Sequence, residues 1–281
     1  TLRINPGFGH GHSQKTNTGG PSSKHGIWHE DLPQALAAAA KYGLKVEGLH
    51  MHIGSGTDME HLALVCGALK DAALAAGPSI RMISAGGGLP VPYRDGEEPI
   101  DLGRYKALWR EVQRELGAEF MHAVELEAEP GRYFVCESGF LLAEVRAVKV
   151  MGENRFYLVD AGFNNLVRPV MYGSFHRITA CPKEERRTAR TQLAAVGGPL
   201  CESGDVFTQE EGGYLQLRDL PELEVGDYVV LHNAGAYGAA MESNYNSKPL
   251  CAQVLIKDGR ANLIRERQRL EHLFADELIP G

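Results

Sequence analysis

Cysteine is scarce in this chain, and no two cysteines stand close together. The five cysteines among the 281 residues are Cys66, Cys136, Cys181, Cys201 and Cys251. An odd, scattered set argues against a disulfide framework and favours a reducing compartment such as the cytoplasm. Because the sequence has no CxxC pair, it also argues against a zinc site built on cysteine.

Long apolar runs, basic clusters and nucleotide-binding fingerprints are missing as well. No apolar run approaches the roughly 18 residues that span a bilayer, so we expect no membrane segment. The net charge of −7 and the lack of a lysine- and arginine-rich run argue against a nucleic-acid partner. Neither a GxGxxG motif nor a P-loop occurs. Residues 1–5 lack the charged start and apolar middle of a signal peptide.

The first 130 or so residues alternate between strand-like and helix-like segments. The predicted strands are 2–4, 45–52, 80–84 and 123–127, and the predicted helices are 31–43, 58–77 and 101–116. Asp31 and Asp58 are typical N-caps, and Gly77 and Gly117 are typical helix stops. This order indicates parallel strands with crossover helices, which a Rossmann sheet and a (β/α) barrel both allow.

The pattern changes after Arg132. The predicted strands there are 140–150, 155–160, 223–232 and 250–256. We expect a charged surface loop at 183–190 and a closing amphipathic helix at 265–278. The chain is therefore predicted to contain an α/β domain at 1–131 and a β-rich domain at 132–281.

Three segments of the first domain run from a predicted strand into small or charged residues. They are 50–56 (HMHIGSG), 84–89 (SAGGGL) and 127–132 (EAEPGR). Ligand sites of both α/β architectures lie at the carboxyl ends of the strands, so we expect one site built from all three. Taken singly, the triple glycine is equally typical of a flexible turn, and the EPGR segment of a surface ion pair.

The chemistry of these segments favours a flat, anionic ligand. Glycines at 86–88 let backbone amides approach an anion. A carboxylate at Glu129 suits a protonated pyridine nitrogen, which makes the ring the electron sink that decarboxylation needs. Arg132 suits a phosphate or a carboxylate. We therefore interpret the three segments as a pyridoxal phosphate site.

Two pairs of histidines could in principle bind a metal ion. His50 and His52 alternate along one predicted strand, and His10 and His12 share a glycine-rich loop. Neither pair has a recognisable third ligand at zinc spacing, so we predict no metal. A neutral imidazole stacked on a flat ring suits His52 better.

Cys201 differs from the other four cysteines because charged residues surround it in the segment 200–205 (LCESGD). Reactive thiols occur in such surroundings, whereas buried cysteines are usually inert. A thiol can donate a proton as a general acid. Tyr172 and Tyr237 stand beside small or cationic residues, although taken singly each would be interpreted as half-buried core.

Together these segments resemble the diaminopimelate decarboxylase family, pyridoxal phosphate enzymes of the alanine racemase-like barrel class. The resemblance covers essentially the whole chain. The segments that carry it are 3–9, 18–20, 23–27, 52–56, 86–88, 129–132, 160–164, 201–205 and 235–238. It implies part of a pyridoxal phosphate-binding (β/α)8 barrel, the second half of its strands, followed by a C-terminal β-rich domain.

The resemblance also implies a role for each matching residue. Those implied to hold the cofactor are His52, Ser55, Gly86, Gly87, Gly88, Glu129, Gly131, Arg132 and Tyr237. Those implied to hold the substrate are Arg132, Arg168, Tyr172 and Glu202. Cys201 is implied to be the catalytic proton donor, lent to the partner subunit's site, so a homodimer with shared active sites is expected.

The implied reaction is loss of CO2 from meso-2,6-diaminopimelate to give L-lysine, the last step of lysine biosynthesis. Two alternatives stay open: a related decarboxylase for ornithine, arginine or carboxynorspermidine, and a catalytically inactive homologue with a regulatory or binding role. The second arises because the family's Tyr-x-x-Lys-like segment, which carries the Schiff-base lysine, is absent. At roughly 30 residues per strand–helix unit, on the order of 120 residues are expected to precede Thr1.

Overall fold

The computed structural model of the chain describes residues 1–183 and 190–280. Most of the predicted charged loop at 183–190 therefore lies outside the described residues. The chain forms two compact units, Thr1–Val135 (unit 1) and Cys136–Gly281 (unit 2). In the described part of the chain, no helix combines the length and the apolar composition needed to cross a membrane.

Unit 1 is built on a parallel sheet with the order β2-β1-β3-β4-β5. Its strands are β1 (Leu2–Asn5), β2 (Ile27–Trp28), β3 (Gly48–His50), β4 (Met82–Ser84) and β5 (Glu125–Glu127). The predicted parallel arrangement is confirmed, but β2 was missed. With only two residues and no apolar alternation, β2 carries no periodic signal.

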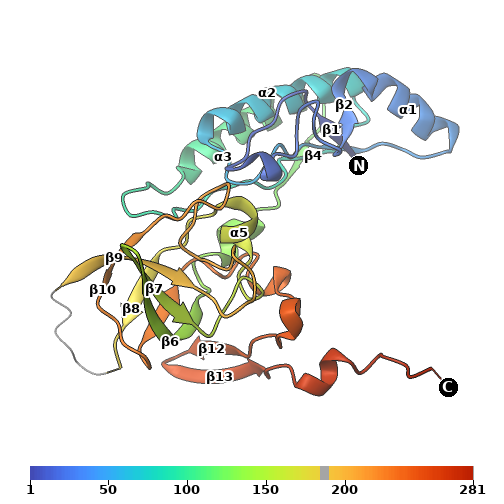
Figure 1. Cartoon of the computed structure of the whole chain (residues 1–281). Helices are drawn as coiled ribbons and strands as arrows, with labels where there is room; N and C mark the ends of the chain where they lie inside the picture. Colours follow the sequence, from blue (N-terminus) through green and yellow to red (C-terminus); the bar gives the residue numbers. More distant parts are fainter. Residues whose placement is uncertain (184–189, 281) are drawn as a thin grey trace. The chain divides into compact units, whose positions relative to one another are not determined.

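Three long helices accompany this sheet: α1 (Leu32–Lys41), α2 (Met59–Ala76) and α3 (Leu102–Phe120) (Figure 1). Side chains of α2 and α3, among them Leu69 and Trp109, pack with Leu49 and Ile83 of the strands in one buried core. The predicted N-cap is confirmed at Asp58, whose Oδ1 accepts from the backbone N–H of His61 at 2.9 Å.

Gly117 was wrongly predicted to end α3. The helix continues to Phe120 and ends at Met121, which has a left-handed backbone with φ 58°. Leu116 and Phe120 lie one turn apart on the same face, and both are buried. Burying a phenylalanine stabilises by about 1.5–3 kcal/mol, which outweighs the roughly 1 kcal/mol that a glycine costs inside a helix.

Unit 2 contains a six-stranded sheet with the order β10-β9-β7-β6-β11-β8, antiparallel except for the pair β7–β9. Its strands are β6 (Leu141–Met151), β7 (Asn154–Val159), β8 (Ile178–Cys181), β9 (Thr191–Gly197), β10 (Arg218–Pro221) and β11 (Tyr228–Leu231). Tyr157, Val196 and Val229 lie in its buried core. The prediction of a β-rich second part is confirmed, although the predicted strand 223–232 is shortened to β11.

The predicted helix at 265–278 is wrong. Strands β12 (Gln253–Lys257) and β13 (Arg260–Arg265) form a separate hairpin, and only a short 3-10 turn follows at Leu270–Leu273. Asp258 and Gly259 connect the two strands with φ values of 51° and 71°. An Asp-Gly pair with two positive φ angles is typical of the tight turn of a hairpin. The hairpin ends at Arg265, where the predicted helix was expected to begin. Beyond it, Leu270, Phe274 and Leu278 stay exposed, and a helix without a buried apolar face gains too little from packing to form.

Candidate functional site

The three glycines after β4 are packed against neighbouring backbone. A Cβ on Gly86, where φ is +62°, would overlap the carbonyl oxygen of Met51. A Cβ on Gly88, where φ is +99°, would lie 2.6 Å from the carbonyl oxygen of Gly54. Only glycine tolerates both the backbone conformation and the close approach. The loop therefore presents bare backbone to any ligand.

His52 lies against this loop as a neutral ring. The backbone N–H of Gly87 donates to His52 Nδ1 at 3.1 Å, so Nδ1 is an acceptor and the ring proton sits on Nε2. Burial, and then the charge of Arg3, lower the pKa of His52 to about 4. Arg3 Nη2 and the Thr18 hydroxyl donate to the His52 carbonyl at 3.0 and 2.9 Å, which fixes its backbone.

Acid is expected to destabilise the protein less when His52 is replaced by glutamine. Between pH 4 and the ordinary histidine value of 6.5, the unfolded chain binds the His52 proton more tightly than the folded chain. Stability from this residue is therefore full above about pH 6.5 and falls as the pH is lowered toward 4. In urea unfolding, the loss between pH 7.5 and 4.5 should be about 2 kcal/mol smaller in the His52→Gln variant. An equal loss in both proteins would contradict a His52 ring that stays neutral in the folded protein.

Glu129 lies at the end of β5, beside the glycines and His52. Its backbone N–H donates to the Gly86 carbonyl at 2.7 Å. A Cβ on Gly87 would lie 2.7 Å from the Glu129 carbonyl oxygen and 3.5 Å from His52 Cε1. The structure thus brings the ends of three strands together. The Glu129 carboxylate is largely exposed, and its Oε2 lies 3.3 Å from His50 Nε2.

Gly131 and Arg132 begin the short helix α4 (Gly131–Val135) directly after Glu129. A Cβ on Gly131 would meet nothing within 4 Å, so space is open there. Arg132 is buried, and its Nη1 donates to the hydroxyl of Tyr93, over whose ring the guanidinium also lies at 5.7 Å from the centroid. Sequence reasoning missed Tyr93, because nothing marks a tyrosine 39 residues away as the partner of Arg132.

Ser55 belongs to a loop that Thr57 anchors to the glycines. Thr57 is fully buried, its backbone N–H donates to the Gly88 carbonyl at 3.0 Å, and its hydroxyl donates to the Gly54 carbonyl at 3.1 Å. The backbone N–H of Ser55 donates to the Thr16 carbonyl at 3.2 Å. Thr57 was also missed, since a single threonine at a helix start reads as ordinary capping.

Cys201 and Glu202, two of the residues predicted in unit 2, lie on one loop that Asp205 holds in place. Asp205 is buried, and its carboxylate accepts backbone N–H groups of Phe163 at 2.7 Å and Leu200 at 2.8 Å. Burial, which outweighs these hydrogen bonds, raises the pKa of Asp205. This carboxylate holds the loop in which Cys201 is exposed, and Glu202 Oε2 accepts from the Tyr245 hydroxyl at 3.3 Å.

Helix α5 (Arg168–Tyr172) lies beside that loop, since a Cβ on Gly204 would be 3.6 Å from Val170 Cγ1. Arg168, only 1% exposed, has its Nη1 3.1 Å from His176 Nε2. Tyr237, with φ 62°, stands half-exposed in a separate loop. The predicted substrate and proton-donor residues of unit 2 therefore come from loops and one short helix, not from its strands.

Known proteins resemble the chain in both sequence and structure. The family model for "Pyridoxal-dependent decarboxylase, pyridoxal binding domain" matches residues 1–136. The diaminopimelate decarboxylase of Escherichia coli K12 is 55% identical over 99% of this chain and 67% of its own length. That of Streptomyces coelicolor is 54% identical over 100% of this chain and 64% of its own length. The chain belongs to the diaminopimelate decarboxylase family.

Solved structures of diaminopimelate decarboxylases agree with this assignment. One crystal structure, 55% identical, superposes with a TM-score of 0.93 over 98% of this chain and 66% of its own. That of the Helicobacter pylori diaminopimelate decarboxylase complexed with L-lysine, 32% identical, gives 0.84 over 97% and 65%. The chain thus spans about two-thirds of the length of these decarboxylases. The predicted fold class, part of a pyridoxal phosphate-binding barrel followed by a β-rich domain, is confirmed.

Residues of unit 1 fit the pyridoxal cofactor that this decarboxylase family uses. The glycines at 86–88 carry no side chain that could cover a phosphate, and space is open beside Gly131. His52 supplies a neutral, flat ring, and Glu129 supplies an exposed carboxylate at the same edge of the sheet. The predicted cofactor is therefore confirmed at the level of the family.

Proposed function

We propose that the chain provides the cofactor- and substrate-binding parts of an enzyme that converts meso-2,6-diaminopimelate to L-lysine and CO2, the last step of lysine biosynthesis. One observation supports this most directly: Glu129, Gly87 and His52 meet at one edge of the parallel sheet. They combine an anion-tolerant backbone, a neutral ring and a carboxylate, which is the set that a phosphorylated pyridine needs.

The proposal assigns a role to each unit 1 residue of the predicted cofactor site. When bound, pyridoxal phosphate supplies the electron sink for the leaving carboxylate. Glu129 would hold the pyridine nitrogen in its protonated form, and His52 would stack on the ring. The other assigned residues of unit 1 would hold the phosphate, and Tyr237 is assigned a further cofactor contact. Those phosphate-binding residues are Ser55, Gly86, Gly87, Gly88, Gly131 and Arg132.

The substrate carries an amino acid group at each end, so its site needs both cationic and anionic partners. We assign the carboxylates to Arg132 and Arg168 and the distal ammonium to Glu202, with Tyr172 beside them. Arg168 is held by His176, which limits its freedom and favours a fixed carboxylate position. A crystal structure of a related decarboxylase with L-lysine is consistent with a site for such an amino acid.

Cys201 is assigned the proton that replaces the departing carboxylate. Its exposure on a loop fixed by Asp205 suits a thiol that is lent to another subunit, so we also propose a homodimer with shared active sites. The free cysteines of the described residues favour a cytoplasmic location.

Release of CO2 by the intact protein tests the proposal. We expect diaminopimelate to be used at a kcat/KM at least 100-fold above those for ornithine, arginine and carboxynorspermidine, because each of these lacks part of the double amino acid pattern. Preference for one of them would reject the substrate assignment. Cofactor binding without CO2 release from any substrate would instead indicate the inactive homologue.

A further inference from the structure

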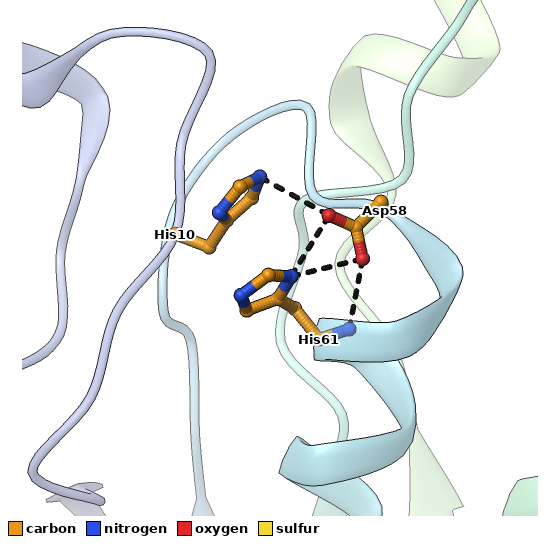
Figure 2. A group of neighbouring side chains, drawn as sticks. All are labelled: His10, Asp58 and His61. Atoms are coloured by element: carbon orange, nitrogen blue, oxygen red, sulfur yellow. Dashed lines mark hydrogen bonds and ion pairs between the residues drawn. The ribbon is translucent and has the colours of Figure 1, made fainter.

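Three side chains of types that can bind a metal ion converge in unit 1 beside the start of α2. They are His10, from the loop between β1 and β2, Asp58, the N-cap of α2, and His61, in the first turn of α2. Asp58 Oδ2 lies 3.3 Å from His10 Nε2 and 2.8 Å from His61 Nδ1. Figure 2 shows the carboxylate beside both rings, with a dashed line to each, and the two rings stack on each other at 3.9 Å between centroids.

The position of His10 is set by its backbone rather than by this cluster. Its N–H donates to the Ile53 carbonyl at 3.2 Å, and its carbonyl accepts from the Thr57 hydroxyl at 3.3 Å. Its carbonyl also packs so closely on Gly54 that a Cβ there would overlap it. Asp58 and His61 are fixed in the same way by the helix start. The backbone at each of the three donors is therefore held in place by contacts outside the cluster, as a metal site requires.

We propose that His10, Asp58 and His61 bind a divalent transition-metal ion of the zinc class. Two imidazole nitrogens and one carboxylate oxygen suit zinc and its neighbours, whereas magnesium and calcium take oxygen ligands. Ligand atoms about 2.0 Å from a tetrahedral zinc ion stand about 3.3 Å apart. The three donor atoms here all lie within 4.8 Å of one another. Shifts of about 1.5 Å or less, together with rotation of the two stacked rings about their side-chain bonds, complete the site.

The ion would clip the loop that carries His10 to the first turn of α2. Thr57 contacts the His10 carbonyl through its hydroxyl and the Gly88 carbonyl through its backbone N–H. Thr57 therefore links the proposed metal site to the glycines of the proposed cofactor site. The inference itself does not depend on the proposed function, because the donors lie outside the residues assigned to cofactor and substrate.

Metal titration of the intact protein, after removal of bound metal with a chelator, tests this proposal. Zn²⁺ competed against a chromophoric chelator should show one tight site per chain, weakened at least 10-fold in His10→Gln, His61→Gln and Asp58→Asn. Asparagine caps helices as well as aspartate does, so Asp58→Asn keeps the helix start and removes the anionic ligand. The exposed His29→Gln is the matched control and should bind as the parent does.

Two further measurements distinguish metal binding at this site from metal binding elsewhere in the protein. Co²⁺ should give the visible bands of a tetrahedral nitrogen and oxygen site, and sulfur charge-transfer bands would assign the metal to a cysteine such as Cys201 and overturn the proposal. Zn²⁺ should raise the melting temperature of the parent and of His29→Gln but not of Asp58→Asn. Absence of a tight site, or equal affinity in all the variants, would identify the cluster as a hydrogen-bonded helix cap only.

Discussion

Replacing Glu129 with glutamine is expected to lower kcat for diaminopimelate about 10²–10³-fold while pyridoxal phosphate stays bound. In the proposed site the Glu129 carboxylate keeps the pyridine nitrogen protonated, and an amide of the same shape cannot stabilise that positive charge. A loss of this size corresponds to about 3–4 kcal/mol of transition-state stabilisation. Steady-state kinetics at saturating cofactor, with cofactor occupancy followed by absorbance, measures it.

The substitution is expected to leave the glycine loop intact, because Glu129 contacts the glycines through its backbone. Its N–H donates to Gly86 and its carbonyl oxygen adjoins Gly87, and neither contact depends on the side-chain charge. Glu125→Gln, on the exposed start of the same strand, is the matched control and should keep the parent kcat. A Glu129→Gln variant within twofold of the parent would remove this carboxylate from the mechanism.

The strand ends of unit 1 could be predicted because two features of the sequence mark each one: a strand-like segment, and the small or charged residues that follow it. A predicted strand leads into Gly86, into Glu129 and into His52, and a parallel sheet places all carboxyl ends on one edge. Turn chemistry and sheet topology point to the same edge. This agreement between local pattern and fold is why the sequence alone allowed a site to be proposed there.

Both helix errors arise because the sequence does not show which apolar side chains are buried. Gly117 is typical of a helix end, yet α3 continues past it because Phe120 is buried. The segment 265–278 has helical spacing, yet Leu270, Phe274 and Leu278 stay exposed, so no packing stabilises a helix there. In both cases contacts with distant residues decide the outcome, and local propensities are too weak to do so.

The sequence also did not reveal contacts between side chains that lie far apart along the chain. Arg132 meets Tyr93, and His10 meets Asp58, across 39 and 48 positions of sequence. The metal prediction considered only histidines two residues apart, so His61 was not considered as a partner of His10. Spacing rules find ligands that share one element, whereas this cluster joins a loop to a helix start.

Replacing Cys201 with alanine is expected to lower kcat about 10²–10³-fold with little change in cofactor affinity. The thiol is assigned the proton that replaces CO2, and loss of a general acid typically costs 10²–10⁴-fold. Cys201 is exposed and its loop is held by Asp205, so the fold should tolerate the change. Cys181→Ala, a half-buried thiol on a strand of the same unit, is the control and should retain the parent kcat. An unchanged rate in Cys201→Ala would assign the proton to another group.

Mixing the two inactive variants tests whether that thiol acts on the partner subunit's site. If Glu129 serves its own subunit and Cys201 serves the other, a hybrid of Glu129→Gln and Cys201→Ala chains contains one intact site. Random exchange at equal amounts makes half of the dimers hybrids, so roughly a quarter of the parent activity should return. The control is each variant by itself, taken through the same subunit-exchange procedure. No recovery, with subunit exchange verified by mass, would mean that both residues act within one subunit.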